Sequence, residues 1–355
     1  MSRRAMRCYC IVEHGQPLQA LERPVPQPTG SEVLLRTVAA GVCHTDLHLH
    51  DGYYDLGGGK RMLFADRGIL TPITPGHEVC AEVVAAGADA GEVPRGQTVL
   101  LHPWIGCGEC AACRRGQENL CNKPLSLGIN RPGGFAEYLL VPHPRYLIDI
   151  EGLDPAQAAP LACAGVTTFS ALRKFGMRIQ EAPVLIIGAG GLGLMALSIL
   201  KAMGGVGAIV ADIDPLKRAA ALAAGALQAV DAAAPDAHKQ IIAATDGGAA
   251  SVLDLVGATA TQNLAQRAVA RGGQIVIVGL MGGDITLSLP MVVMRPLAIQ
   301  GSFVGTLAEL RELVALVKKT RMPPIPIVRR PFSEANAALQ DLHAGRIIGR
   351  VVLQP

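Results

Sequence analysis

VLIIGAGGLG, at residues 184–193, decides the fold of the second half of this chain. Its four leading apolar residues predict a buried strand, and the glycines after them predict a tight turn into a helix. Gly188, Gly190, Gly191 and Gly193 would let backbone amides approach a dinucleotide pyrophosphate, which the helix N-terminus would stabilise. We therefore interpret this stretch as a dinucleotide-binding turn rather than an ordinary glycine-rich connection.

The alternation of strand and helix continues beyond this turn. Apolar β-type runs recur at 207–213, 251–256, 274–279 and 297–303, and segments of helical character such as 215–226 separate them. This order of elements predicts an α/β fold with a parallel, doubly wound sheet.

Asp212 ends the second strand of this series, where a carboxylate can accept hydrogen bonds from the adenosine ribose hydroxyls. Its charge would repel the 2′-phosphate of NADP, so we predict NAD as the cofactor. Lys217 and Arg218 lie about one helical turn farther on, and we count Lys217 among the cofactor-binding candidates. The alternative is a surface aspartate with no ligand.

The first half of the chain has a different pattern. Short β-type runs at 33–38, 79–85, 98–101 and 135–141 are separated by glycine and proline turns. The tail predicts a helix over 333–343 and a last strand over 349–353, which we expect to rejoin the first half. A length of 355 residues also favours two domains over one.

Composition excludes several classes of protein. Half of the residues are hydrophobic and 17% are charged, which argues against disorder. A formal charge of +3 without long basic runs gives no reason to invoke nucleic acid. The apolar stretches are too short to span a bilayer, and the first residues, MSRRAMRC, contain no apolar signal segment. We therefore expect a cytoplasmic protein that binds neither nucleic acid nor membranes.

Four closely spaced cysteines form the clearest metal motif: Cys107, Cys110, Cys113 and Cys121. Such spacing predicts a tetrahedral thiolate cage around zinc. Four thiolates leave no coordination position for a substrate, so this site would be structural. The alternative is a disulfide cluster, which the odd total of nine cysteines and the length of the chain disfavour.

A second metal site is indicated by GVCHTDLH at 41–48 and TPGHE at 74–78. Cys43 and His77 could hold a catalytic zinc with one further protein ligand and one open position. Cys163 is the best candidate for that third ligand, although buried cysteines without a ligand role are common.

Taken together, the motifs at 41–48, 75–78, 107–121, 163–167 (CAGVT) and 188–193 resemble the medium-chain, zinc-dependent alcohol dehydrogenases. The resemblance covers essentially the whole chain. It implies a β-rich, GroES-like catalytic domain over 1–164, a Rossmann cofactor domain over 165–302, and a return to the catalytic domain over 303–355. It also implies two zinc ions per chain and NAD.

The resemblance implies roles for the residues around the catalytic zinc. Cys43, His77 and Cys163 would be the ligands, and Glu78 would visit the metal during ligand exchange. Asp46 would orient the zinc-bound histidine. Thr45 would hydrogen-bond the substrate oxygen and pass its proton through the cofactor ribose to His48.

Three more positions match family residues that contact the cofactor. His44 and Arg350 would face the pyrophosphate, and Thr167 would pack against the nicotinamide. Without the resemblance, each of these polar residues would be read as an ordinary surface or capping group.

The segment 53–70 is longer than we expect in short microbial relatives. We place it near the mouth of the active site, and Gly57 to Gly59 would make it mobile unless a substrate or a neighbouring subunit orders it. Candidate pocket walls are Tyr53, Tyr54, Trp104, Leu280 and Met281, which favour an apolar or aromatic alcohol. The short interval between Cys121 and Cys163 resembles the tetrameric microbial branch, so we expect a homotetramer.

The leading hypothesis is an NAD-dependent zinc alcohol dehydrogenase that interconverts primary or secondary alcohols and their aldehydes or ketones. A second is a zinc dehydrogenase of a polyol, a sugar or an acyl-CoA-linked alcohol. A third is a non-enzymatic binding or structural protein that has kept the fold, which would predict the loss of ligands that are all present here.

Overall fold

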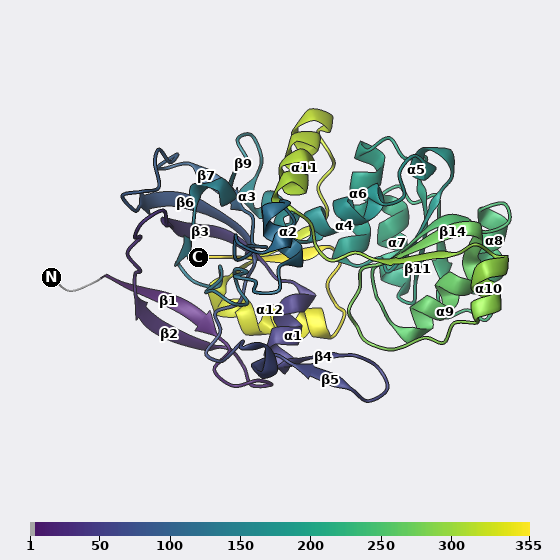
Figure 1. Cartoon of the computed structure of the whole chain (residues 1–355), viewed down its shortest axis with the longest axis horizontal. Coiled ribbons are helices and arrows are strands. Elements are labelled where there is room, and N and C mark those ends of the chain that lie inside the picture. Colours follow the sequence, from purple (N-terminus) through teal and green to yellow (C-terminus); the bar gives the residue numbers. More distant parts are fainter. Residues whose placement is uncertain (1–3) are drawn as a thin grey trace.

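A six-stranded parallel sheet forms one half of the molecule and a mostly antiparallel β structure forms the other (Figure 1). The computed structural model describes residues 4–355. The parallel strands are β10 (Val184–Ile187), β11 (Ala208–Asp212), β12 (Gln228–Asp231), β13 (Ala249–Asp254), β14 (Val269–Ile277) and β15 (Ala298–Gly301). Their order is β12-β11-β10-β13-β14-β15, which is the doubly wound arrangement that the sequence predicted.

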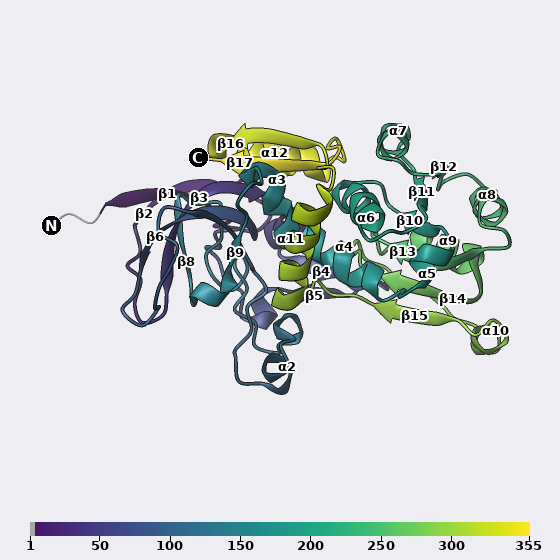
Figure 2. The same cartoon turned by 90° about the horizontal axis from the view of Figure 1, so that it is seen from above.

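The sheet is buried on both faces because its strands alternate between two apolar cores. Val184 and Ile186 belong to a core with α4 (Ala164–Arg173) and α6 (Gly191–Ala202). Leu185 and Ile187 belong to the opposite core. The helices α8 (Ala237–Ala244) and α9 (Thr259–Ala268) supply that second core (Figure 2). The direction of winding changes between β10 and β13, which leaves a ligand-binding crevice at the carboxyl ends of these strands.

The other half is built around a second sheet, with strand order β16-β17-β3-β6-β7-β9 and β8 added beside β3. In chain order these strands are β3 (Val33–Gly41), β6 (Glu78–Ala86), β7 (Thr98–Leu101), β8 (Tyr138–Val141), β9 (Leu147–Asp149), β16 (Ile327–Pro331) and β17 (Arg350–Gln354). A separate hairpin pairs β1 (Ala5–Cys10) with β2 (Gln19–Pro24).

The tail of the chain returns to this β-rich half. Strand β17 pairs antiparallel with β3 at Gly41 and Ala40, which confirms the expectation for the last strand. Helix α12 (Ala335–His343) precedes it and packs beside α1 (His44–Asp51). The domain limits placed at residues 164 and 302 stay a prediction. Helices α4 and α11 (Leu307–Thr320) pack on each other and on α6, between the two sheets (Figure 1).

The long segment after α1 folds into a hairpin of β4 (Tyr53–Asp55) and β5 (Arg61–Leu63). Its tip contacts the cofactor half: a Cβ added at Gly57 would lie 2.6 Å from the Gly283 carbonyl carbon. The predicted position near the site is therefore correct. Within the chain, Gly57 packs against Gly283 and Gly58 lies near Asp284, both in the cofactor half, whereas Gly59 has no neighbour within 4 Å of an added Cβ.

None of the helices in the described part of the chain combines the length and the apolar content that crossing a bilayer requires.

His102 lies at the end of β7 in the core of the β-rich half. Its side chain is fully buried, its ring stacks on Tyr146 at 6.2 Å, and neither ring nitrogen has a hydrogen-bond partner. Burial therefore lowers the pKa of His102 to about 3. The folded protein holds this imidazole neutral, whereas the unfolded chain protonates it near a pKa of about 6.5.

We predict that stability falls as the pH drops below about 6.5 toward 3, because only the unfolded chain takes up this proton in that window. At pH 5 the loss from this one group is about 2 kcal/mol. His102→Phe keeps a ring on Tyr146 and should remove that part of the pH dependence. The measurement is the free energy of unfolding at pH 7.5 and 5 for the wild type, His102→Phe and the exposed-histidine control His343→Gln. Equal pH dependence in all three would contradict the assignment.

Candidate active site

Three segments that are distant in sequence bring Cys43, His77 and Cys163 together. Cys43 is the N-cap of α1, His77 directly precedes β6, and Cys163 is the N-cap of α4. All three side chains are buried, and their ligand atoms lie within 4.8 Å of one another. The structure thus assembles the three ligands that the sequence proposed for one metal ion.

The geometry of this cluster fits zinc. Tetrahedral zinc with Zn–S bonds of about 2.3 Å places two sulfurs about 3.8 Å apart, and the Cys43 and Cys163 Sγ atoms are 3.9 Å apart. Neither ring nitrogen of buried His77 has a hydrogen-bond partner. A hydrogen bond from the Cys163 thiol lowers the pKa of Cys43, which favours the thiolate form that metals bind. Three protein ligands leave a fourth position open, as a catalytic zinc requires.

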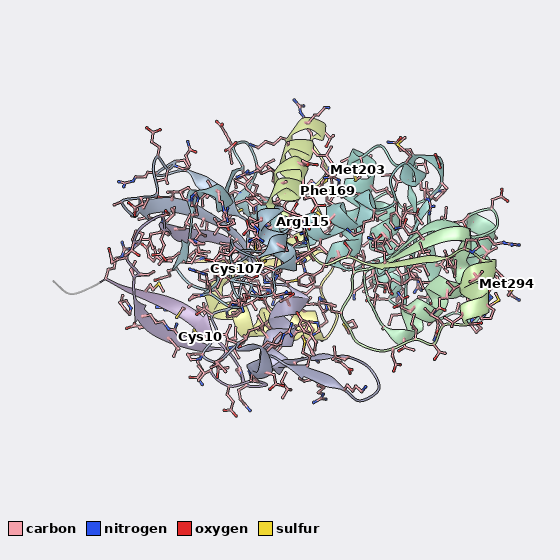
Figure 3. The ribbon with its side chains drawn as sticks, in the orientation of Figure 1. Cys10, Cys107, Arg115, Phe169, Met203 and Met294 are labelled. Atoms are coloured by element: carbon pink, nitrogen blue, oxygen red, sulfur yellow. The ribbon has the colours of Figure 1, made fainter. Side chains whose placement is uncertain are left out.

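The four-cysteine loop forms the second cluster. Its ligand atoms also lie within 4.8 Å of one another, with Sγ–Sγ separations of 3.5 Å for Cys110–Cys113 and 3.8 Å for Cys110–Cys121. Figure 3 labels Cys107, the first of the four cysteines. A backbone hydrogen bond from Cys113 lowers the pKa of Cys110 to about 6. These four thiols form a closed zinc site.

Glu118 links this loop to the β-rich half through hydrogen bonds and an ion pair. Its carboxylate accepts hydrogen bonds from the Gly106 N–H at 2.9 Å and from the Tyr146 hydroxyl at 2.7 Å. Arg145 adds an ion pair at 3.2 Å. The loop is therefore held at its base by a buried polar contact that spacing alone did not indicate.

Asp46 supports the ligand segments from inside α1. Its fully buried carboxylate accepts hydrogen bonds from the Cys43 N–H at 2.8 Å and from the Gly76 N–H at 3.1 Å. The same carboxylate lies 3.6 Å from His77 Nδ1. It thus fixes the backbone on both sides of the cluster and places a negative charge beside the imidazole.

Glu78 lies outside the ligand cluster, although it follows His77. Its Oε1 forms an ion pair with Arg350 at 2.9 Å, and both side chains are buried. Burial raises the pKa of Glu78 to about 8, while the nearby Arg350 charge opposes that rise. The predicted occasional metal contact of Glu78 stays a prediction.

The other polar residues of α1 face the same region. Thr45 Oγ1 lies 4.0 Å from Cys43 Sγ. Burial lowers the pKa of His44 and of His48, so both imidazoles are neutral near pH 7. The His48 ring packs against Tyr54 of the hairpin at 4.7 Å.

The glycine turn has the shape that a pyrophosphate needs. Gly188 has φ +99°, and a Cβ added at Gly193 would collide with the Gly188 carbonyl oxygen. A Cβ added at Gly191 would lie 2.7 Å from the Gly349 oxygen and 3.5 Å from the Arg350 guanidinium. Gly190, the N-cap of α6, faces open space. The predicted turn and Arg350 therefore meet at one place, and the residues fit a dinucleotide.

Asp212 lies beside this turn at the end of β11. Its carboxylate accepts hydrogen bonds from the Ala189 N–H at 2.7 Å and from the Asp214 N–H at 2.9 Å. Lys217 Nζ is 4.0 Å from Asp214 and points toward Gly345. Thr167 lies in the first turn of α4, buried, with an unpartnered hydroxyl.

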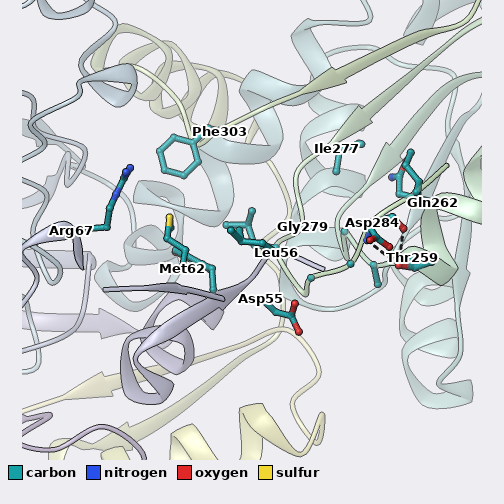
Figure 4. A pocket seen from close by; sticks show the side chains of 17 residues that line it. Asp55, Leu56, Met62, Arg67, Thr259, Gln262, Ile277, Gly279, Asp284 and Phe303 are labelled. Carbon is teal, nitrogen blue, oxygen red and sulfur yellow. Dashed lines mark hydrogen bonds between the residues drawn. The ribbon is translucent and has the colours of Figure 1, made fainter. Parts of the chain in front are cut away.

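A cavity of about 530 Å³ opens between the hairpin and the cofactor half (Figure 4). Of the predicted walls, Tyr54 and Leu280 line it, whereas Tyr53, Trp104 and Met281 do not. Sequence reasoning missed most of the lining residues, among them Leu56, Met62, Arg67 and Phe303. Phe303 could have been found from the end of the strand expected over 297–303.

Aromatic side chains connect the cavity wall with the metal cluster. Phe303 packs against Trp104 at 6.3 Å, and Trp104 packs against His77 at 5.4 Å. Trp104 is buried and donates its indole N–H to the Ala162 carbonyl at 3.1 Å. An apolar ligand in the cavity would thus lie against Phe303, which is linked to His77 by two successive ring contacts.

Comparisons with known proteins agree with this geometry. Residues 29–152 match the model of the alcohol dehydrogenase GroES-like domain, and residues 191–319 match that of zinc-binding dehydrogenases. The chain is 36% identical over 351 residues to an NAD-dependent alcohol dehydrogenase of Sulfurisphaera tokodaii, covering 99% of this chain and 100% of the relative.

Two further relatives bear on the site. A D-arabinose 1-dehydrogenase (NADP(+)) of Saccharolobus solfataricus is 33% identical, with 97% of this chain and 96% of the relative covered. The crystal structure of an alcohol dehydrogenase from Aeropyrum pernix superimposes with a TM-score of 0.89 at 32% identity, covering 98% of this chain and all of that one.

The predicted GroES-like and Rossmann-type halves and the two zinc sites are therefore confirmed. Full-length relatives, two matching family models and a complete Cys–His–Cys cluster lead to one conclusion: the chain belongs to the zinc-containing medium-chain alcohol dehydrogenases, an enzyme family.

Proposed function

We propose that this chain is an NAD-dependent alcohol dehydrogenase that interconverts an apolar or aromatic primary or secondary alcohol and its aldehyde or ketone. The observation that carries the proposal is the cavity wall of Tyr54, Leu280 and Phe303, which leads through Trp104 to the metal ligand His77. Similarity to NAD-dependent relatives and the carboxylate of Asp212 support NAD as the cofactor.

Cys43, His77 and Cys163 would hold the catalytic zinc, and Asp46 would orient His77. When bound, the zinc ion supplies Lewis acidity that lowers the pKa of the alcohol hydroxyl, and NAD supplies the hydride acceptor. Glu78 would serve as a replacement ligand only when its ion pair with Arg350 opens.

Thr45 and His48 would move the proton. They are three residues apart on α1, so they share one helix face. The Thr45 Oγ1 atom would accept a hydrogen bond from the substrate hydroxyl. His48 would then accept the proton on a ring nitrogen, because burial lowers its pKa and keeps that nitrogen free near neutral pH.

The remaining roles concern the cofactor. Gly188, Gly190, Gly191 and Gly193 would admit the pyrophosphate, with His44 and Arg350 beside it. Asp212 and Lys217 would bind the adenosine ribose, and Thr167 would pack against the nicotinamide.

A second candidate function is the oxidation of a sugar or polyol. The cavity lining also includes Asp55, Gln262 and Asp284, and Gln262 Oε1 is buried without a partner. Such acceptors suit hydroxyl groups, and one relative acts on D-arabinose. The non-enzymatic alternative is set aside, because the chain belongs to an enzyme family and retains its complete metal cluster.

We also propose a cytoplasmic homotetramer. Strand β15 is at the edge of the parallel sheet, and α10 (Leu289–Met294) beside it exposes Leu289, Val293 and Met294 at the outer end of the molecule (Figure 3). An apolar sheet edge favours pairing with another copy. All nine cysteines are free thiols, which suits a reducing compartment.

Steady-state assays of NAD reduction with benzyl alcohol, a medium-chain alkanol, sorbitol and D-arabinose test the proposed substrate class. We expect the two apolar alcohols to give kcat/KM values at least tenfold above those of sorbitol and D-arabinose, because Leu280 and Phe303 on the cavity wall cannot replace the hydration that a polyhydroxylated substrate loses. The opposite order would favour the second candidate function.

Cys43→Ser should leave one zinc per chain and lower kcat/KM by about a thousandfold or more, since several kcal/mol of Lewis-acid stabilisation is lost. Metal content by mass spectrometry and circular dichroism check this result. Cys80→Ala changes a buried cysteine outside both clusters and should keep two zinc ions. Full activity of Cys43→Ser with one zinc would refute the ligand assignment.

Asp212→Ala should raise KM for NAD by about tenfold to a hundredfold, because the ribose would lose its hydrogen bonds to a charged acceptor. It should also reduce the preference for NAD over NADP, because the charge that repels the 2′-phosphate is gone. Asp231→Ala, at the matching position of β12, is the control and should keep the wild-type preference. An unchanged preference in Asp212→Ala would mean that this carboxylate does not face the ribose.

A further inference from the structure

Arg67 is an exposed residue on the cavity wall. It ends the 3-10 turn η1 (Ala65–Arg67), and its N–H donates to the Phe64 carbonyl at 2.9 Å. Phe64 is buried and packs edge-on against Tyr54 at 5.0 Å. Because this aromatic pair anchors the turn, the backbone that carries Arg67 lies beside the cavity.

The guanidinium of Arg67 has no partner within residues 4–355. It forms none of the hydrogen bonds or ion pairs that other surface arginines make, such as Arg173 with Glu312 at 2.5 Å or Arg330 with Asp341 at 2.6 Å. On the same hairpin, Arg61 packs over the Tyr53 ring at 4.0 Å, away from the cavity. Arg67 therefore offers five N–H donors to whatever the cavity holds.

The material between Arg67 and the metal site is apolar. Figure 4 places Met62 and Phe303 next to Arg67, and Phe303 continues through Trp104 to His77. A molecule that reaches from the metal to Arg67 must therefore be apolar in its middle and charged at its far end.

The other charges of the cavity limit that far end to a single negative charge. Asp55 and Asp284 lie toward the opposite end from Arg67 (Figure 4). Asp55 accepts a hydrogen bond from the Gly57 N–H at 2.8 Å, and the Asp284 backbone pairs with the Thr259 hydroxyl. Asp55 and Asp284 would repel a phosphate dianion more strongly than a carboxylate monoanion, and a carboxylate matches the guanidinium in charge and in bidentate shape.

We infer that Arg67 is a specificity-determining residue and that the preferred substrates are apolar or aromatic alcohols carrying a carboxylate at the end remote from the carbinol. This inference rests on the proposed alcohol dehydrogenase function and names its substrate class more closely. The carboxylate adds a charged hydrogen-bonding contact at the rim and leaves the chemistry at the metal unchanged.

The test compares three matched substrates on the zinc-loaded, full-length enzyme with NAD at neutral pH: benzyl alcohol, 4-(hydroxymethyl)benzoate and 4-(aminomethyl)benzyl alcohol. These substrates are neutral, anionic and cationic at the far end. We expect kcat/KM for the anion to exceed that for the neutral alcohol by about tenfold, as for a charged hydrogen bond weakened by partial exposure. The ratio should fall with added salt, because the pair is near the surface.

Arg67→Gln should bring the anion-to-neutral ratio close to one, and Arg67→Lys should restore part of it. Arg61→Gln removes a cation from the same hairpin but outside the cavity, and it should keep the wild-type ratio. Turnover of benzyl alcohol with no anion preference, or with the cation preferred, would overturn the inference and leave the proposed function standing. An anion-to-neutral ratio that stays the same in Arg67→Gln would also overturn the inference. If the enzyme oxidised none of the three alcohols, the proposed function itself would fail.

Discussion

The structure depends on two thiols and one imidazole that are buried together at the junction of three chain segments. Buried polar groups without partners are costly. Both His77 nitrogens lack hydrogen-bond partners, while the Cys43 and Cys163 sulfurs lie at the separation expected for two ligands of one zinc ion. A bound metal would satisfy one of these nitrogens, with Asp46 beside the other, so the folding of α1, β6 and α4 around the cluster and the binding of zinc are linked. Asp46 strengthens the link by holding the backbone at both Cys43 and Gly76.

A second buried contact connects the metal site with the cofactor site. Arg350 begins the last strand, pairs with Glu78 next to the ligand His77, and lies against Gly191 of the glycine turn. A single guanidinium thus contacts the ligand-bearing segment and the dinucleotide turn. Because β17 pairs with β3, the tail of the chain carries this group into the middle of the molecule. The two halves are therefore joined at the site by a charge pair as well as at the hairpin tip.

Much of this arrangement was predictable from sequence because it is encoded locally. The strand–glycine–helix stretch at 184–193, the spacing of the four cysteines and the alternation of strands after residue 207 each reflect short-range geometry. The role of Cys163 as a metal ligand was harder to predict, since only the resemblance to a family distinguished it from a buried cysteine such as Cys80. Contacts made by tertiary packing were not predictable. The glycines at 57–59 suggested mobility, yet the hairpin tip packs on Gly283, and no local signal indicated Arg67 as a lining residue.

The central claim is that Cys43, His77 and Cys163 share one zinc ion beside the cavity. Anomalous diffraction from crystals of the purified protein, recorded on both sides of the zinc absorption edge, tests it most directly. The account predicts two anomalous peaks per chain, one within the four-cysteine loop and one bonded to Cys43, His77 and Cys163. A single peak in the cysteine loop of a zinc-replete crystal, or a second peak bound by other residues, would contradict it.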